Sequence, residues 1–462
     1  MSAATEPRSA RDIPVQGLRA GGCTVRPAPA RSTGALSPAR RRPAVLVMVF
    51  SMIAALAVVG GAPPLTRIGA VVNAHGTSVS ATPTLSQVQL RATASILLAT
   101  RAQAVLARDP AAFAQTSAAG GSGPDYRRLA NLPITAWAYH LGAVSSDGSV
   151  ATVTATLAYR FSGDSQSALL PLEISLLDAG GRWVVSSERT SGSRPAIWEV
   201  GIPTVVRGQH SLVIGVGDTS SAVAGLRQWA RTADQAVLGV RRVLPEGWVP
   251  RVTVVVPAST ADLATLLGRD SAGLTQIGAV TTAEARGEDR PARGADRVWL
   301  NTPLLAKLTP LGRLILLRHE VTHVATGSAA TDATPLWLEE GLAEVVGYRG
   351  SGVSLATAAT DATALVRAGQ VLGGLPTMAA LTGPMPAAAY EEAYLACVVL
   401  TDEVGLPGLV RLYRLTARGA QSDPAGNVDR ALRRVTGSGT AALTRAWRAL
   451  LTAVAERPTP ST

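Results

Sequence analysis

The spacing of apolar and polar residues changes along this chain and predicts three successive kinds of structure. From residue 85 to 118, apolar residues recur three and four positions apart, as on one face of a helix, with a break at Asp109-Pro110. Between residues 134 and 188, four segments alternate like strands and are separated by turns containing Gly, Ser or Asp. From residue 311 onward the pattern is mainly helical. The chain therefore predicts an α+β fold.

The middle of the chain combines both patterns. Strand-like segments at residues 198–208 and 210–217 are followed by a strongly helical run at 220–244. Residues 251–259 are almost continuously apolar, which is typical of a strand buried on both faces. A further strand ends at Asn301, shortly before the next helix. We therefore expect a small sheet directly upstream of the helical region.

The pentapeptide H-E-V-T-H at residues 319–323 lies inside the first of these later helices. Residues four apart share one face of a helix, so the imidazoles of His319 and His323 can bind the same ion. Glu320 lies between them, placed to take a proton from water at that ion. The chain has only five histidines. The other three are isolated, and we expect them on the surface or in loops: His75, His140 and His210.

Zinc sites of the catalytic kind use three protein ligands and keep an open position for water. A third ligand is available in the segment W-L-E-E-G-L-A-E, residues 337–344. Glu340 and Glu344 are one helical turn apart and share a face. Glu339 points about 100° away from Glu340 on a helix, so we expect it to face solvent.

The pattern H-E-x-x-H followed by W-L-x-E-G-x-A resembles the gluzincin metallopeptidases, the peptidase MA-like clan that includes thermolysin. The resemblance covers roughly residues 200–455. It implies one Zn²⁺ per chain, held by His319, His323 and Glu340. It also implies that Glu344 accepts a hydrogen bond from His319 and that the enzyme hydrolyses peptide bonds, with Glu320 as general base.

The resemblance extends to two further features. Aminopeptidases of this clan stabilise the oxyanion with a Tyr downstream of the zinc site, which matches Tyr390; Ala393 replaces the family's Gly, and Tyr394 is the alternative. Enzymes of the clan also bind extended substrate along an edge strand, for which we expect Val298 to Asn301. Because the aminopeptidase motif G-x-M-E-N is not seen, we expect an endopeptidase.

The helix and antiparallel strands of residues 85–192 resemble the NTF2-like fold. This resemblance depends on the order of elements rather than on a motif. No catalytic His/Asp dyad is seen in this part of the sequence. We therefore expect a spacer, binding or regulatory domain rather than a second active site.

Charge and hydropathy suggest a membrane location. The net charge is +11, and residues 1–42 hold eight Arg against Glu6 and Asp12. Residues 43–62 contain no charge and are long enough to span a bilayer. By the positive-inside rule the N-terminus stays cytoplasmic and the rest is extracytoplasmic. We favour an uncleaved signal anchor; cleavage after Ala74 would instead give a secreted protein.

The remaining composition excludes other classes of protein. No dense basic stripe with interleaved aromatics follows the N-terminal tail, so we expect no nucleic-acid partner. Cys23 and Cys397 fall on opposite sides of the predicted membrane, so we expect no disulfide, and Cys397 is expected in the core.

The leading hypothesis is a membrane-anchored, extracytoplasmic zinc peptidase that acts on a peptide or protein substrate. One alternative is an inactive cell-surface scaffold that binds partners through the NTF2-like domain, and another is a hydrolase of non-peptide substrates. The predicted organisation is a disordered tail at 1–42, an anchor at 43–62, a linker at 63–84, an NTF2-like domain at 85–192 and a peptidase domain at 195–456.

Overall fold

The computed structural model describes residues 50–51, 86–217, 223–286, 291–328, 333–370, 373–383, 386–420 and 422–457. The predicted tail, the linker and most of the predicted anchor lie outside the described residues. Within the anchor segment, β1 (Phe50–Ser51) pairs in parallel with β10 (Ile277–Arg286). The membrane topology therefore stays a prediction.

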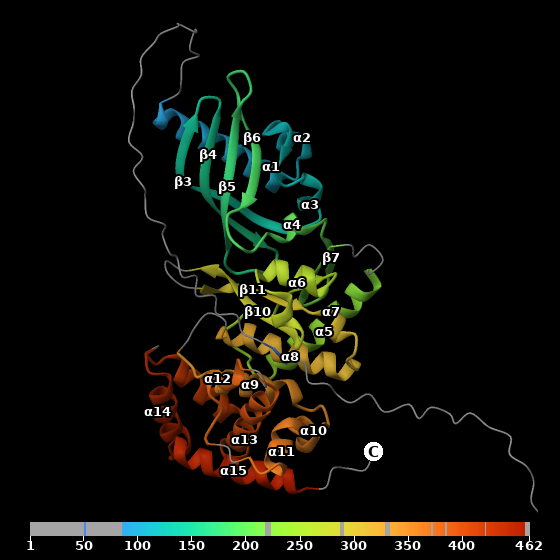
Figure 1. Cartoon of the computed structure of the whole chain (residues 1–462), viewed down its shortest axis with the longest axis vertical. Coiled ribbons are helices and arrows are strands. Elements are labelled where there is room, and N and C mark those ends of the chain that lie inside the picture. Colours follow the sequence, from blue (N-terminus) through green and yellow to red (C-terminus); the bar gives the residue numbers. More distant parts are fainter. Residues whose placement is uncertain are drawn as a thin grey trace, which may run out of the picture. The chain divides into compact units, whose positions relative to one another are not determined.

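The first described part is a helix packed on a five-stranded sheet, with the order β2-β6-β5-β4-β3. Strands β3 to β6 are antiparallel, β2 joins β6 in parallel, and α1 packs against the sheet (Figure 1). Along β4 buried and exposed positions alternate, because one face of the strand covers the core. The elements are α1 (Gln87–Ala107), α2 (Pro110–Gln115), β2 (Ser117–Ser122), α3 (Tyr126–Ala130), β3 (Ile134–Asp147), β4 (Val150–Phe161), β5 (Ala168–Asp178) and β6 (Trp183–Thr190).

The predicted break after the first helix is confirmed. Arg108 has a left-handed backbone conformation with φ 57°, which ends α1. The Asp109 side chain then accepts hydrogen bonds from the amides of Ala111 and Ala112, and Pro110 begins α2. The sequence therefore encodes this turn locally.

The second sheet is six-stranded, with the order β1-β10-β11-β9-β8-β7. Its middle strands β8, β9 and β11 are parallel, and β7 and β10 run antiparallel to their inner neighbours. The elements of this region are α4 (Ile197–Val200), β7 (Thr204–Arg207), β8 (Ser211–Val216), α5 (Val223–Arg241), β9 (Val252–Pro257), α6 (Thr260–Leu267), η1 (Ser271–Leu274), β10, β11 (Pro291–Leu300) and α7 (Thr302–Leu305).

The apolar run in β9 has the predicted two-sided burial, because all six positions are buried. Alternate residues belong to different cores: Val254 packs in the cluster that includes α5 and the later helices, whereas Val255 packs in the cluster that includes α6 and the first sheet. Two details differ from expectation. Residues 197–200 form α4 instead of strand, with Trp198 buried against Trp137, and β10 was not predicted.

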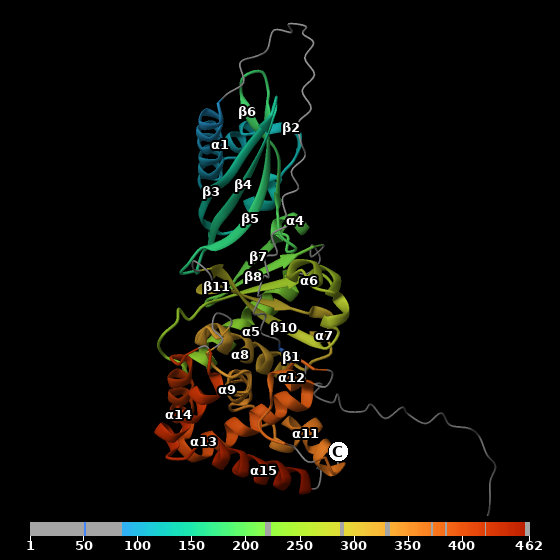
Figure 2. The same cartoon turned by 60° about the vertical axis from the view of Figure 1, so that its left-hand side comes forward.

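Helices make up the rest of the described chain. Helix α13 packs against α9, α11, α14 and α15, and α15 also packs against α11 (Figure 2). They are α8 (Pro310–Thr326), α9 (Leu336–Tyr348), α10 (Leu355–Ala358), α11 (Thr360–Arg367), α12 (Met378–Leu381), α13 (Pro386–Ala417), α14 (Pro424–Thr436) and α15 (Thr440–Glu456).

Helix α13 is kinked at Gly405, next to Pro407. Among the described helices, α13 alone is both long enough and apolar enough to cross a membrane. Its contacts with α9, α14 and α15, and the burial of Tyr390, Glu391 and Cys397 on it, fit a core helix of a globular domain. Cys397 is fully buried, as expected for a core residue.

Two glycines bring α9 close to the helices on either side of it. A Cβ atom at Gly341 would collide with the carbonyl oxygen of Ala393 and the sulfur of Cys397 on α13. A Cβ at Gly347 would lie 3.0 Å from the carbonyl oxygen of Ile315 on α8. The absence of side chains at both positions therefore lets α9 fit between α8 and α13.

We expect Gly341→Ala to destabilise the fold by about 1–3 kcal/mol, because the added methyl group has no space without moving α13. Gly225→Ala is the matched control, since nothing lies within 4 Å of a Cβ at that helical position. The control is expected to be neutral or to stabilise by up to about 1 kcal/mol. Urea unfolding followed by tryptophan fluorescence measures both changes, and equal stability of the two variants would contradict the close contact.

Candidate metal centre

Helices α8 and α9 bring three ligand atoms together in a buried position. His319 Nε2 lies 3.0 Å from His323 Nε2 and 3.1 Å from Glu340 Oε2, and His323 Nε2 lies 3.4 Å from Glu340 Oε2. The three residues are at most 2 % exposed. A tetrahedral Zn²⁺ with bonds of about 2.0–2.1 Å separates its ligands by about 3.3 Å. The spacing therefore suits one small cation held by all three side chains.

The other ring nitrogen of each histidine has a partner that orients it. His319 Nδ1 lies 3.3 Å from Glu344 Oε1, as the resemblance implied. His323 Nδ1 lies 2.9 Å from Ser328 Oγ. Hydrogen bonds at Nδ1 leave the Nε2 lone pairs directed at the shared centre.

Ser328 is a site residue that sequence reasoning missed. Gly327 ends α8 with φ 68°, and its amide donates to the carbonyl of His323 at 2.8 Å. This turn returns the chain toward His323, so the next residue can reach the ring. The only signal in the sequence was a glycine directly after the helix, followed by a hydroxyl residue.

Glu320 is fully buried, and its two oxygens differ. Oε2 accepts a short hydrogen bond from the hydroxyl of Thr281 on β10. Oε1 has no hydrogen-bond partner among the described residues. A buried carboxylate oxygen without a donor is costly unless water or a substrate group satisfies it. Thr281 was missed because β10 itself was not predicted.

The electrostatics of the centre favour positive charge. Burial by itself lowers the pKa of His319, but the carboxylates of Glu344 and Glu340 outweigh it and raise this pKa well above 6.5. Burial raises the pKa of Glu340, whereas His323 and His319 reverse the effect and lower it. The acidic side chains therefore stabilise either a proton on His319 or a cation at its Nε2.

Tyr390 lies close to the carboxylates of the centre, and Tyr394 lies one helical turn away. Burial raises the pKa of Tyr390 well above 10, and the charges of Glu340, Glu320 and Glu344 raise it further. The Tyr394 ring instead packs on Tyr348, with centroids 5.1 Å apart. Of the two tyrosines left open by the sequence, Tyr390 is therefore the one beside the carboxylate of Glu340.

The expected substrate strand is wrong. Val298 lies in β11, which pairs with β10 on one side and β9 on the other and so has no free edge. Asn301 is 1 % exposed, and its amide donates to the carbonyls of Leu274 and Ile277 at 2.9 Å each. Both residues have structural roles, and β10 is the strand that contacts Glu320.

Glu339 also differs from expectation, since it is only 5 % exposed. Helix α9 is enclosed by α8 and α13, so the side that carries Glu339 is covered as well. Of the isolated histidines, His140 is exposed on β3 and His210 is half-buried before β8. His75 lies outside the described residues.

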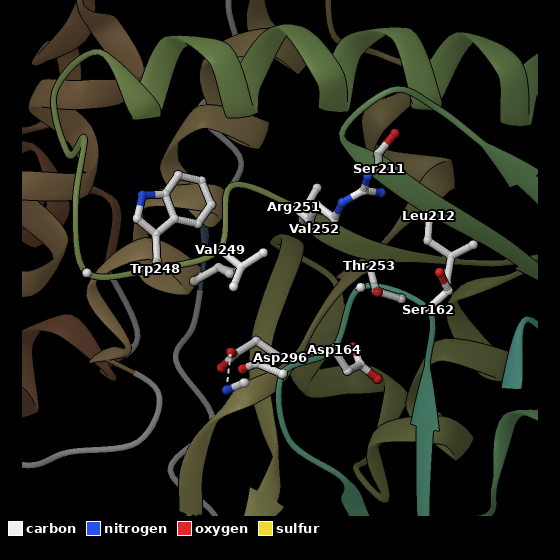
Figure 3. Close-up of a pocket in the computed structure, with 15 residues that line it drawn as sticks. Ser162, Asp164, Ser211, Leu212, Trp248, Val249, Arg251, Val252, Thr253 and Asp296 are labelled. Atoms are coloured by element: carbon white, nitrogen blue, oxygen red, sulfur yellow. Dashed lines mark hydrogen bonds between the residues drawn. The ribbon is translucent and has the colours of Figure 1, made fainter. Parts of the chain in front are cut away.

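A separate cavity of about 360 Å³ lies near the β4–β5 turn and the second sheet (Figure 3). Val324 of α8 lines it, but none of the three proposed ligands does. The Asp164 carboxylate is bound by Arg297, with distances of 2.6 and 2.7 Å to its two terminal nitrogens. This acidic group is therefore already neutralised, and the cavity is distinct from the metal centre.

Comparisons with known proteins add no family assignment. No family model matches the chain, and no curated protein matches it. Among solved structures, one similar chain is Rv3472 from Mycobacterium tuberculosis, described as a protein of unknown function. The identity is 13 %, the match covers 23 % of this chain and 74 % of the other, and the TM-score is 0.20.

We expect Glu344→Gln to weaken zinc binding by about 10–100-fold, because His319 loses the charged acceptor that orients its ring. Glu403→Gln on the exposed surface of α13 is the matched control and should bind zinc like the original protein. Competition with a chromophoric chelator measures both affinities. Unchanged affinity in the Glu344 variant would contradict the orienting role.

Zinc affinity should also depend on pH, because protons compete for the histidines. The carboxylates raise the pKa of His319 above 6.5, so affinity is expected to fall with decreasing pH already above pH 6.5. A chelator titration at several pH values between about 5.5 and 8.5 tests this dependence. A flat profile over that range would contradict the coupling of His319 to the carboxylates.

Proposed function

We propose that this protein is a zinc-dependent peptidase that hydrolyses peptide bonds in a peptide or protein substrate. The observation that carries the proposal is the convergence of His319 Nε2, His323 Nε2 and Glu340 Oε2 beside Glu320, whose Oε1 lacks a hydrogen-bond donor among the described residues. Residues 43–62 would anchor the chain, with the catalytic domain outside the cytoplasm.

The chemistry divides among the residues of the centre. A bound Zn²⁺ supplies a Lewis acid that polarises a carbonyl group and lowers the pKa of water to about 7. Glu320 takes the proton of the attacking water through Oε1 and passes it to the leaving amine. Tyr390 donates a hydrogen bond to the carbonyl oxygen as negative charge develops on it. Thr281 holds the Glu320 carboxylate in one orientation.

Strand β10 is the proposed binding edge for an extended substrate. Thr281 on this strand contacts Glu320, so a peptide along β10 would pass the general base. The outer edge of β10 pairs with β1, at Phe50 opposite Ile277 and Ser51 opposite Ala279. Phe50 and Ser51 belong to the proposed anchor, so a chain held in a membrane by residues 43–62 would leave this edge of β10 to a substrate.

The first sheet with α1 is proposed to be an NTF2-like domain with a spacer or binding role. A buried ion pair joins Arg101 Nε to Glu188 Oε2 at 2.8 Å, and the Tyr139 hydroxyl donates to Glu188 Oε1 at 2.9 Å. Arg101 also contacts the Phe113 ring and the Thr116 hydroxyl. These buried polar groups form hydrogen bonds and ion pairs with one another, so we propose no catalytic role for the domain.

The metal is tested first. The purified full-length chain is expected to contain about one zinc, and His323→Ala to lose it, because two remaining ligands bind too weakly. His140→Ala is the matched control, since that histidine is exposed on β3 and should leave zinc content unchanged. Atomic absorption measures all three. Folded wild-type protein that binds no zinc would overturn the peptidase and favour the scaffold.

The base is tested separately. We expect Glu320→Gln to keep zinc but to lose hydrolysis by about 10²-fold or more, because no side chain then accepts the proton. Glu403→Gln serves again as the carboxylate control. Cleavage of an unfolded, fluorescently labelled protein measures the rates. Equal rates in the Glu320 variant would rule out this mechanism, and a zinc-loaded protein without cleavage would favour a non-peptide substrate.

A further inference from the structure

A groove lined by none of the proposed metal ligands has an unusual lining. Its volume is about 610 Å³, and twelve residues line it. Six are aliphatic residues or prolines, and the other six are Arg242, Arg349, Arg411, Arg414, Arg418 and Arg434. No acidic, aromatic or hydroxyl side chain lines this arginine groove. It therefore combines positive charge with apolar surface.

Four helix ends explain how six arginines come together. Arg242 and Arg349 follow α5 and α9 directly, and Arg434 lies in the last turn of α14. Arg414 lies in the last turn of α13, Arg411 lies about one turn earlier, and Arg418 follows the helix directly. The C-terminus of a helix carries about half a negative charge. Four such ends offset about two of the six positive charges, so most of the charge remains.

Carboxylates do not neutralise the remainder. None of the six arginines forms an ion pair with a carboxylate in the described part of the chain. By contrast, Arg430 and Arg433 of the same α14 pair with Asp423 and Asp429. The groove is distinguished by the gathering of six such arginines around one hollow with no carboxylate among its lining residues.

Arg318 adds a partly buried positive charge beside the groove. Its Nη1 donates to the carbonyl oxygen of Arg349 at 3.0 Å, and its buried Nε has no partner among the described residues. It therefore places a further guanidinium beside Arg349 of the groove. The arginines therefore repel one another, and an anion bound between them would relieve that repulsion.

We propose that the arginine groove binds the head group of an anionic phospholipid and docks the helical domain on a membrane surface. Guanidinium groups bind phosphate oxygens through paired hydrogen bonds. The aliphatic half of the lining would contact the glycerol and the first acyl carbons. A nucleic acid fits less well, because single strands use aromatic side chains for base stacking and none lines the groove.

Binding is tested with the full-length chain in a zwitterionic detergent. Calorimetry compares short-chain phosphatidylglycerol, short-chain phosphatidylcholine and inorganic phosphate. We expect phosphatidylglycerol to bind at least about tenfold more tightly than either of the others, because only it combines net negative charge with apolar chains. Equal affinity for inorganic phosphate would overturn the lipid assignment in favour of a simple anion site.

Variants locate the site. The triple change Arg411→Gln, Arg414→Gln and Arg418→Gln is expected to weaken phosphatidylglycerol binding at least about tenfold, because three charge-assisted donors are lost. The matched control carries Arg227→Gln, Arg231→Gln and Arg445→Gln, three exposed positions outside the groove. An equal loss in the control would show that net charge alone drives binding and would overturn the proposal.

Two further measurements keep the outcome interpretable. Zinc content and unfolding temperature report whether the triple variant folds, and Arg434→Gln on α14 provides a second, milder test of the same groove. A short single-stranded DNA is added as a competitor. If it binds more tightly than phosphatidylglycerol and displaces it, the groove is a general polyanion site and the lipid proposal is overturned. Because no proposed catalytic residue is changed, failure of this proposal leaves the zinc peptidase untouched.

Discussion

The close fit of α9 between α8 and α13 is the constraint on which the metal centre depends. Gly341 and Gly347 allow this fit, because a side chain at Gly341 would strike the backbone of α13 and one at Gly347 would press on α8. Only at this distance can Glu340 reach the histidines of α8 while Tyr390 approaches from α13. The glycine beside Glu340 is therefore part of the site, although it offers no ligand atom.

The centre concentrates ionisable groups where burial is costly. His319, Glu320, His323 and Glu340 are at most 2 % exposed, and a charge in such surroundings requires a partner. Neighbouring hydrogen bonds satisfy Nδ1 of both histidines and one oxygen of Glu320. What remains is a set of ligand atoms close enough together to hold one divalent cation.

Charged side chains are arranged differently in the domain of the first sheet and in the helical region. In the first, Arg101 and Glu188 neutralise each other inside the domain. In the second, carboxylates gather inside at the centre, and arginines gather outside at the helix ends of the arginine groove. The carboxylates of the centre and the arginines of the groove thus lie at different places in the helical region. The two proposed ligands, a cation at the inner group and an anion at the outer one, correspond to this arrangement.

The sequence by itself determined the features that local spacing encodes. The α+β class, the break at Asp109 and the shared face of His319 and His323 follow from periods of two and about four residues. The tertiary structure decided the order of strands in the second sheet and how deeply α9 is enclosed. Val298 therefore lies in an interior strand, Glu339 is buried, and Thr281 and Ser328 join the site. These outcomes depend on contacts between residues distant in sequence, which local periodicity does not record.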